Sequence, residues 1–273
     1  NMHGVARLAN GKLFVTYRDA SITDTTLPSE IDRYSFDGSA LSFETRYTET
    51  CPRLHGAASN SQFLAFGCSD GVLAIYVSDA GFPAIKLGNP DGLAEDSRIG
   101  TLAGHPEVAN LVGIAGNRLF AIDPLSADSI YQELDLGEGV NRIAQGFDAH
   151  GEVFYVLGDD GGLRLFDPAD WELVTTVSVV DPLTEDATKP AVAASATGDR
   201  LYVLDPAGQK IIEIDSGDGD ILGTMDLGFS ASTLVWLGLA EHDHDHEHED
   251  DHDHEEDHDH EEDHDHDHEE SEE

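Results

Sequence analysis

The chain has few basic residues, no long apolar run and no familiar catalytic motif. Against 56 Asp and Glu it holds only 14 Lys and Arg, which gives a formal net charge of −42 over 273 residues. Such a chain repels nucleic-acid phosphates and anionic lipids, so we expect no nucleic-acid partner and no basic membrane-binding surface. Because no run of about 18 or more apolar residues occurs, we also expect no membrane insertion.

The catalytic signatures that would indicate an enzyme are missing as well. The sequence contains no P-loop, no G-x-S-x-G motif and no CxxC motif, and we expect the protein not to be an enzyme. No secretory signal opens the chain, but it begins with Asn1 rather than Met. We interpret it as a processed or truncated product, so the missing signal says little about the compartment.

Cysteine is nearly absent, with Cys51 and Cys68 as the two examples. The count alone leaves two alternatives open. They are either two unrelated buried thiols or a disulfide formed in an oxidising compartment.

What the chain does have is a C-terminal segment of unusual composition. Residues 241–273 hold 11 His, 21 Asp and Glu and one Ser, and they carry half of the formal negative charge. With no hydrophobic residue the segment cannot form a core, so we expect it to be disordered without a ligand. We therefore expect a body over residues 1–240 and a tail over residues 241–273.

The alternation of His with acidic residues in the tail predicts metal binding. Imidazole nitrogens and carboxylate oxygens would bind zinc, nickel or copper, and we expect zinc to be the biological metal. The carboxylates also favour imidazolium, so protons compete with the metal as the pH falls. The expected ligands are His242, His244, His246, His248, His252, His254, His258, His260, His264, His266 and His268.

The body has a repeated pattern of short strand-like runs without a helical period. An apolar residue, then Asp, then a turn former recurs around Asp37, Asp123, Asp167 and Asp215, with a looser copy at Asp79. Steps of 42 to 48 residues with several short strands per unit are typical of β-propeller blades. We expect an all-β protein with five blade-like repeats, followed by a final strand over residues 232–239. Five blades are either a complete propeller or the C-terminal part of a larger one, and we expect the latter.

Three of the four body histidines fall at similar places in consecutive repeats. His3, His55 and His105 each precede an apolar strand, and the steps between them are 52 and 50 residues. Segments that open a blade usually border the central channel, so three imidazoles that converge there would form a zinc site. The alternative is that these histidines hydrogen-bond to backbone across blades. The fourth, His150, lies in a turn, where we expect a solvated or structural role.

The matching places in the fourth and fifth repeats hold basic residues instead of histidine. They are Asn141-Arg142 and Lys189-Pro190. These residues either face an anion or close the channel.

The stretch from Cys51 to Val72 resembles a known family. The runs Cys51-Pro52-Arg53-Leu54-His55-Gly56-Ala57 and Ala65-Phe66-Gly67-Cys68-Ser69-Asp70-Gly71-Val72 are similar to those of periplasmic β-propeller zinc metallochaperones that accompany zinc ABC transporters. The resemblance implies a disulfide between Cys51 and Cys68, a channel zinc site and a periplasmic location. It also implies a partner, the solute-binding protein of the transporter. The family carries its His-rich segment near the N-terminus and its members are longer, which are two departures.

The resulting hypothesis is a monomeric periplasmic metallochaperone that captures zinc and passes it to the solute-binding protein. Two alternatives remain. One is a zinc store without directed transfer, and the other is a propeller hydrolase that uses a metal in the channel.

Overall fold

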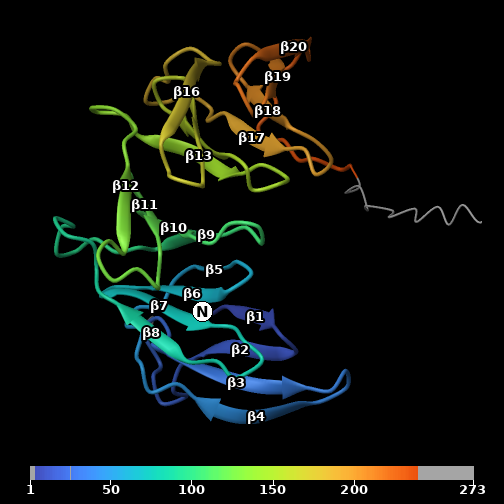
Figure 1. The fold of residues 1–273 in the computed structure, drawn as a ribbon. Helices are drawn as coiled ribbons and strands as arrows, with labels where there is room; N and C mark the ends of the chain where they lie inside the picture. Colours follow the sequence, from blue (N-terminus) through green and yellow to red (C-terminus); the bar gives the residue numbers. More distant parts are fainter. Residues whose placement is uncertain (1–3, 25, 239–273) are drawn as a thin grey trace, which may run out of the picture. The chain divides into compact units, whose positions relative to one another are not determined.

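A computed structural model describes residues 4–24 and 26–238 of the protein. Twenty strands in this part form five four-stranded antiparallel sheets. Figure 1 shows how the sheets follow one another along the chain. In every sheet the four strands are paired in the order of the sequence, which is the meander of a propeller blade. The predicted all-β propeller fold is therefore confirmed. The boundary expected at residues 240 and 241, together with the metal-binding tail, lies outside the described residues and stays a prediction.

Each blade contains four strands, which follow one another in the sequence from the inner to the outer edge of the sheet. The first blade consists of β1 (Ala6–Ala9), β2 (Lys12–Tyr17), β3 (Glu30–Phe36) and β4 (Leu41–Arg46). The second consists of β5 (Ala57–Ser59), β6 (Phe63–Cys68), β7 (Gly71–Tyr76) and β8 (Ala84–Leu87). The third consists of β9 (Thr101–Ala103), β10 (Leu111–Ala115), β11 (Arg118–Ile122) and β12 (Tyr131–Leu134). The fourth consists of β13 (Arg142–Phe147), β14 (Phe154–Gly158), β15 (Gly162–Phe166) and β16 (Leu173–Ser178). The fifth consists of β17 (Ala191–Ala194), β18 (Arg200–Asp205), β19 (Lys210–Asp215) and β20 (Ile221–Asp226).

Glycine makes the central hairpins of the second and fourth blades possible. Gly71 has a φ of 134°, and a Cβ there would lie 1.9 Å from the carbonyl oxygen of Leu87. Gly161 has a φ of 80°, and its Cβ would lie 2.0 Å from the carbonyl oxygen of Val180. In both cases the chain that leaves the blade passes directly over the turn, so a side chain has no room. Both hairpin turns therefore depend on glycine at these two positions.

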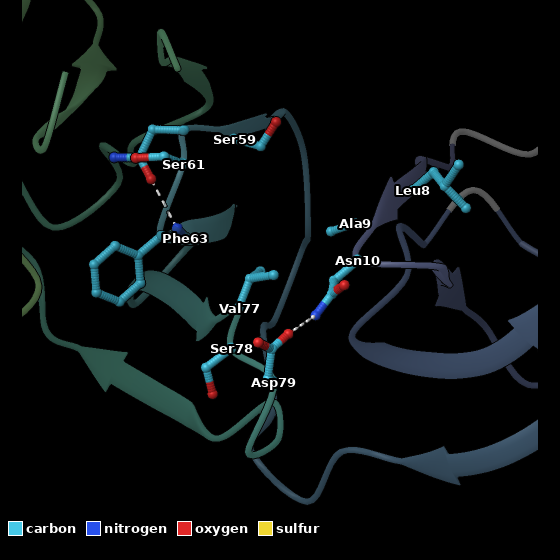
Figure 2. Close-up of a pocket in the computed structure, with 10 residues that line it drawn as sticks. Leu8, Ala9, Asn10, Ser59, Ser61, Phe63, Val77, Ser78 and Asp79 are labelled. Carbon is cyan, nitrogen blue, oxygen red and sulfur yellow. Dashed lines mark hydrogen bonds between the residues drawn. The ribbon is translucent and has the colours of Figure 1, made fainter. Parts of the chain in front are cut away.

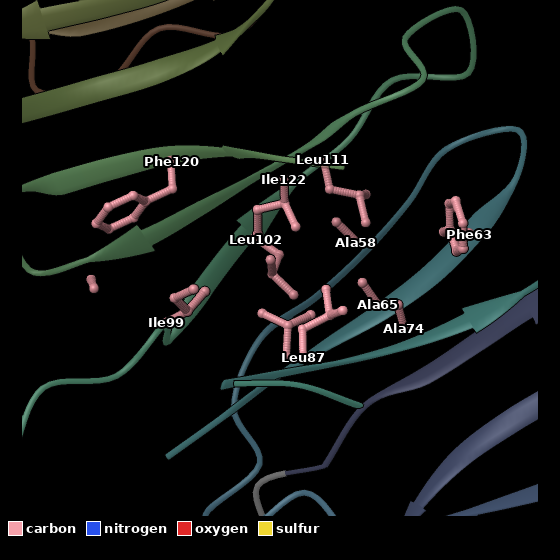
Figure 3. Packing of buried hydrophobic residues seen from close by; sticks show 12 residues of the cluster. Ala58, Phe63, Ala65, Ala74, Leu87, Ile99, Leu102, Leu111, Phe120 and Ile122 are labelled. Atoms are coloured by element: carbon pink, nitrogen blue, oxygen red, sulfur yellow. The ribbon is translucent and has the colours of Figure 1, made fainter. Parts of the chain in front are cut away.

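The core lies between the blades rather than within any one of them. The central strands of the second, third and fourth blades, such as β6, β10, β14 and β15, are buried along their whole length. Figure 3 shows the cluster that joins the second and third blades, to which Phe63 and Leu87 contribute from the second blade and Leu102 and Phe120 from the third. Similar clusters join the first blade to the second, the third to the fourth and the fourth to the fifth. A blade is therefore stabilised mainly by burying its faces against its neighbours.

The prediction of a final strand over residues 232–239 is wrong. Residues 232–238 have no strand conformation. Instead the ring of Trp236 stacks on Tyr202 of the fifth blade, with the ring centroids 5.5 Å apart. An apolar run becomes a strand only when a neighbouring strand satisfies its backbone groups. Residues 232–238 pair with no strand, and Trp236 contacts the fifth blade through its side chain instead. The described part of the chain also contains no helix that could cross a membrane.

We expect Phe154→Ala to lower the free energy of unfolding by about 3–5 kcal/mol. Phe154 is fully buried between the third and fourth blades, and its ring lies 4.8 Å from that of Phe147 and 5.9 Å from that of Trp171. Denaturant titration measures the change. The control is Phe229→Ala at a side chain that is 60% exposed, where we expect less than about 0.5 kcal/mol. Equal effects at the two positions would contradict the assignment of the core to the blade interfaces.

Candidate functional site

The first strand of each blade is the edge of its sheet, and the first strands of the first four blades border a shared hollow. This inner hollow has a volume of about 540 Å³. It is lined by residues of four consecutive first strands and of the turns that follow them: Arg7, Ala57, Ala58, Ser59, Leu102, Ala103, Gly104, His105, Gly146 and Phe147. The small residues that open each blade therefore keep this space free.

His55 lies two residues before β5 and joins the second blade to the third. Its Nδ1 is 2.9 Å from the carbonyl oxygen of Gly100, which directly precedes β9. Because a carbonyl can only accept, Nδ1 carries a proton, and in the neutral ring Nε2 then has its lone pair free. The side chain is exposed, and no residue that the structure describes hydrogen-bonds to Nε2. Zinc-binding histidines usually have this arrangement, with one nitrogen donating to a carbonyl and the other facing the metal.

A disulfide holds the segment that carries His55. Cys51 and Cys68 are bonded and fully buried, which confirms the pairing that the family resemblance implied. The backbone N–H of Ser69 donates to Pro52 at 2.7 Å, and that of His55 donates to Gly67 at 2.9 Å. The segment from Cys51 to His55 is therefore tied to the end of β6 by a covalent bond and by backbone hydrogen bonds on both sides.

Two glycines allow the neighbouring blade to approach this segment. A Cβ on Gly56 would lie 2.6 Å from the carbonyl oxygen of Gly100, and Gly56 has a φ of 76°. A Cβ on Gly67 would lie 2.1 Å from the carbonyl oxygen of Ile99. The close approach is what brings the carbonyl of Gly100 within reach of the His55 ring.

His105 also joins two blades, but both of its ring nitrogens are used. Nε2 lies 3.2 Å from the carbonyl oxygen of Ala149 in the fourth blade, and the backbone N–H of Glu107 donates to Nδ1 at 3.3 Å. The ring is thus the neutral form with the proton on Nε2. To bind zinc through Nδ1, His105 would have to give up the contact with Glu107.

His55 and His105 do not occupy equivalent positions in their blades. His55 precedes β5, whereas His105 follows the end of β9 by two residues. Since Gly56 lies beside Gly100 and Ser59 lies beside Gly104, the two rings are offset by four to five strand residues, or on the order of 15 Å. Zinc–nitrogen bonds are about 2 Å long, so one ion cannot bind both rings in this arrangement.

The reason for this difference from the sequence expectation is the true repeat length. His55 contacts its equivalent, Gly100, at a separation of 45 residues, whereas the step from His55 to His105 is 50 residues. The five additional residues carry His105 from the start of the inner strand to its end. Two residues whose separation is close to the repeat length can therefore occupy different positions within their blades.

The other predicted ligands are not brought together in the described structure. His3 and the tail histidines lie outside the described residues, so their role as ligands stays a prediction. Among residues 4–24 and 26–238, no three His, Cys, Asp or Glu side chains form a group that could hold a metal ion. His150 is exposed, and its Nε2 is 3.9 Å from a carboxylate oxygen of Asp199.

The position in the fourth blade that matches His55 is used for a structural contact. Asn141 donates from its backbone and its side chain to the two carboxylate oxygens of Asp159, at 2.9 and 2.7 Å. These hydrogen bonds, with the side chain of Asn141 as the larger cause, lower the pKa of Asp159. Asn141 therefore ties the start of β13 to the turn that follows β14, and its side-chain oxygen also accepts a hydrogen bond from Asn117 of the third blade.

A second hollow lies where β1 and β5 end, between the first and second blades (Figure 2). It has a volume of about 570 Å³, and Asn10 donates to Asp79 across it at 3.2 Å. Asp79 is its single ionisable lining residue. With one carboxylate and no histidine, this hollow has neither the ligands for a metal nor a pair of groups for acid–base chemistry.

We expect that replacing both cysteines, with Cys51→Ala and Cys68→Ala, lowers the free energy of unfolding by about 2–4 kcal/mol, because the open chain gains conformational entropy. Denaturant titration with and without dithiothreitol measures the effect. The reductant should destabilise the wild type towards the double variant and leave the variant unchanged. A double variant as stable as the oxidised wild type would contradict a structural role for the bond.

No family model matches the chain. Solved structures that are similar to it include two of one protein. Apo AztD from Citrobacter koseri has 24% sequence identity and a TM-score of 0.69 over 86% of this chain and 61% of that one. A second structure of Citrobacter koseri AztD has 23% identity and a TM-score of 0.70 over 88% of this chain and 63% of that one. The chain thus spans a little over three fifths of the length of these proteins, and the likeness shows that they share the propeller fold.

Proposed function

We propose that the protein is a periplasmic zinc metallochaperone. In this proposal the tail captures zinc, His55 holds one ion at the channel, and the ion then passes to the solute-binding protein of a zinc ABC transporter. The observation that carries the proposal is the geometry of His55. Its Nδ1 is 2.9 Å from the carbonyl oxygen of Gly100, so its orientation is set while Nε2 remains available to a metal.

Three further features support the proposal. The 11 tail histidines alternate with acidic residues and supply many nitrogen and oxygen ligands, which suits the capture of zinc. The buried disulfide fits an oxidising compartment such as the periplasm. The fold shared with AztD is the one expected from the resemblance of the Cys51–Val72 stretch to zinc metallochaperones.

The chemistry asked of His55 is ligand exchange. The hydrogen bond to Gly100 selects the tautomer of the neutral ring in which the lone pair of Nε2 can bind zinc. Because His55 is exposed, a ligand of the acceptor can approach the ion before His55 releases it. His3 and His105 remain candidate ligands, with His105 belonging to a different ion from His55.

A zinc store without directed transfer is the second candidate, and the ligand capacity of the tail favours it. A store and a chaperone bind zinc alike but differ in how the ion leaves. A hydrolase finds less support, because the inner hollow contains no carboxylate among its lining residues.

We expect His55→Ala to remove one zinc ion from the body of the protein. The measurement is zinc content by elemental analysis in a full-length background whose tail histidines are all replaced by Gln, after dialysis against a weak chelator. The control is His150→Ala, which removes an exposed histidine near Asp199 and should leave the zinc content unchanged. Equal zinc content in the background and in its His55→Ala form would rule out the channel site.

We expect zinc-loaded protein to fill the apo solute-binding protein in the presence of excess chelator. The chelator intercepts free zinc, so only transfer within a complex of the two proteins can succeed. Stopped-flow fluorescence of the acceptor measures the rate. If the acceptor fills no faster than it does from free zinc under the same conditions, the protein is a store and not a chaperone.

A further inference from the structure

The basic residues of the body fall into two groups that differ in their partners. Nine of the 14 lie within 4.0 Å of a carboxylate oxygen: Lys12, Arg18, Arg33, Arg46, Lys86, Arg118, Arg164, Arg200 and Lys210. None of these nine lies on the first strand of a blade. They are ordinary ion pairs on the second, third and fourth strands and their connections.

The other five have no carboxylate within that distance among the described residues, and they share one location. Arg7 lies in β1, Arg53 four residues before β5, and Arg98 three residues before β9. Arg142 is the first residue of β13, and Lys189 lies two residues before β17. Each blade thus places one unpaired cation where its inner strand begins or, for Arg7, within that strand. With acidic residues four times as numerous as basic ones in the whole chain, this pattern would not arise from a shortage of carboxylates.

Four of these cations lie at the same end of the inner strands as His55. The strands β5 and β9 run in the same direction, because Gly56 lies beside Gly100 and Ser59 beside Gly104. The starts of the inner strands therefore share one end of the channel. We call Arg53, Arg98, Arg142 and Lys189 the basic rim.

The carboxylates in the hairpin turns at this end have partners outside the rim. Asp70 pairs with Lys86, and Asp160 pairs with Arg164. The carboxylate of Asp159 accepts the two hydrogen bonds from Asn141. The connections that carry Arg98 and Lys189 also contain acidic residues, none of which forms an ion pair with the rim in the described structure: Asp91, Glu95, Asp96, Asp181, Glu185 and Asp186. The rim cations therefore lack a direct carboxylate partner among the described residues.

Two arginines of the rim are kept together at a cost in electrostatic energy. Arg98 donates from Nη1 to the backbone carbonyl of Arg53 at 2.8 Å, which holds the two residues side by side across the blade boundary. Burial and then the charge of Arg53 lower the pKa of Arg98. Arg142 is half-buried, and its Nε has no hydrogen-bond partner in the described structure. Uncompensated cations that are held in place are typical of a surface that receives an anionic partner.

We propose that the basic rim is a docking surface for a protein with an acidic surface, and that Arg53 and Arg98 bind carboxylates of that protein beside His55. The proposal rests on the function proposed above, since the acidic partner is the zinc acceptor. A guanidinium group binds a carboxylate through two parallel hydrogen bonds, which fixes the orientation as well as the contact. The partner would then meet the protein where the free Nε2 of His55 is exposed.

The spacing of the rim favours a protein surface over a small anion. Neighbouring sheets pack at most about 10 Å apart, and three blade steps separate Arg53 from Lys189, so the rim extends over roughly 15–30 Å. A small anion contacts one or two of these cations, whereas a protein interface buries about 800 Å² per partner and covers the whole row. At physiological salt, charges further than about 8 Å are screened. The rim can therefore attract carboxylates although the chain is acidic overall.

The test compares two full-length double variants that lose the same charge. Arg53→Gln with Arg98→Gln removes the centre of the rim, whereas Lys12→Gln with Arg118→Gln removes two cations paired to Glu44 and Glu133 elsewhere. The zinc-loaded proteins are titrated with the apo solute-binding protein at about 0.15 M and 0.5 M salt, because the distance over which charges attract shortens as the salt concentration rises. A fluorescent deca-glutamate peptide serves as a second probe.

We expect the rim variant to bind the acceptor and the peptide about tenfold more weakly at the lower salt concentration, since about two charge-assisted contacts are lost. Its affinity should also depend less on salt, while its zinc content and unfolding midpoint stay at the wild-type values. The control variant should bind within about twofold of the wild type.

Each other outcome has a distinct meaning. If the wild type transfers zinc and the rim variant binds as tightly as the control, the docking surface is overturned and the metallochaperone function stands. If the peptide binds through the rim but the acceptor does not bind at all, the chaperone function fails and the rim recognises another acidic protein. If millimolar phosphate at constant ionic strength displaces the peptide, the rim is a small-anion site and this proposal is overturned.

Discussion

The packing of blade against blade is the constraint on which the rest of the structure depends. A four-stranded sheet of this size cannot bury enough apolar surface alone, so Phe66, Phe154 and their neighbours find their partners in adjacent blades. Once the faces are buried, the inner strands approach each other closely enough that glycine is required at Gly56 and Gly67. That approach determines which polar groups meet at the channel.

The polar contacts between the inner segments follow from this packing. Arg7 donates to the carbonyl of Ala57 at 3.0 Å, His55 to that of Gly100 and Asn60 to that of Ala109 at 2.7 Å. Each bond satisfies a carbonyl of the next blade that no inner strand covers, because an inner strand is the edge of its sheet. The histidines at the channel therefore have a structural role in the protein whether or not they bind zinc. At His55 the two roles are compatible, since one ring nitrogen serves each, whereas at His105 they compete.

Much of the fold could be predicted because local chemistry determines it. The recurring apolar-Asp-turn landmark concerns residues that are close in sequence. The bond between Cys51 and Cys68 was expected from the family resemblance of that stretch, because the cysteine count alone left two alternatives open. The two predictions that the structure does not match both concern residues whose partner is distant. The run over residues 232–238 has apolar residues but no strand partner, and Trp236 packs on Tyr202 instead. His55 and His105 have a step close to one blade, yet a difference of five residues moves one ring to the opposite end of the inner strand.

The sequence by itself determined the repeat, the hairpin turns and the composition of the acidic His-rich segment, because these depend on period, backbone freedom and charge. Only the tertiary structure decided which ring nitrogen of His55 has a hydrogen-bond partner and which cations lack a carboxylate among the described residues. It also showed that the unpaired cations gather at the starts of the inner strands. The physical reason is that hydrogen bonds and ion pairs act over a few ångströms. Their partners come from neighbouring blades some 45 residues away. The spacing of residues along the chain does not specify which atoms come within a few ångströms of each other.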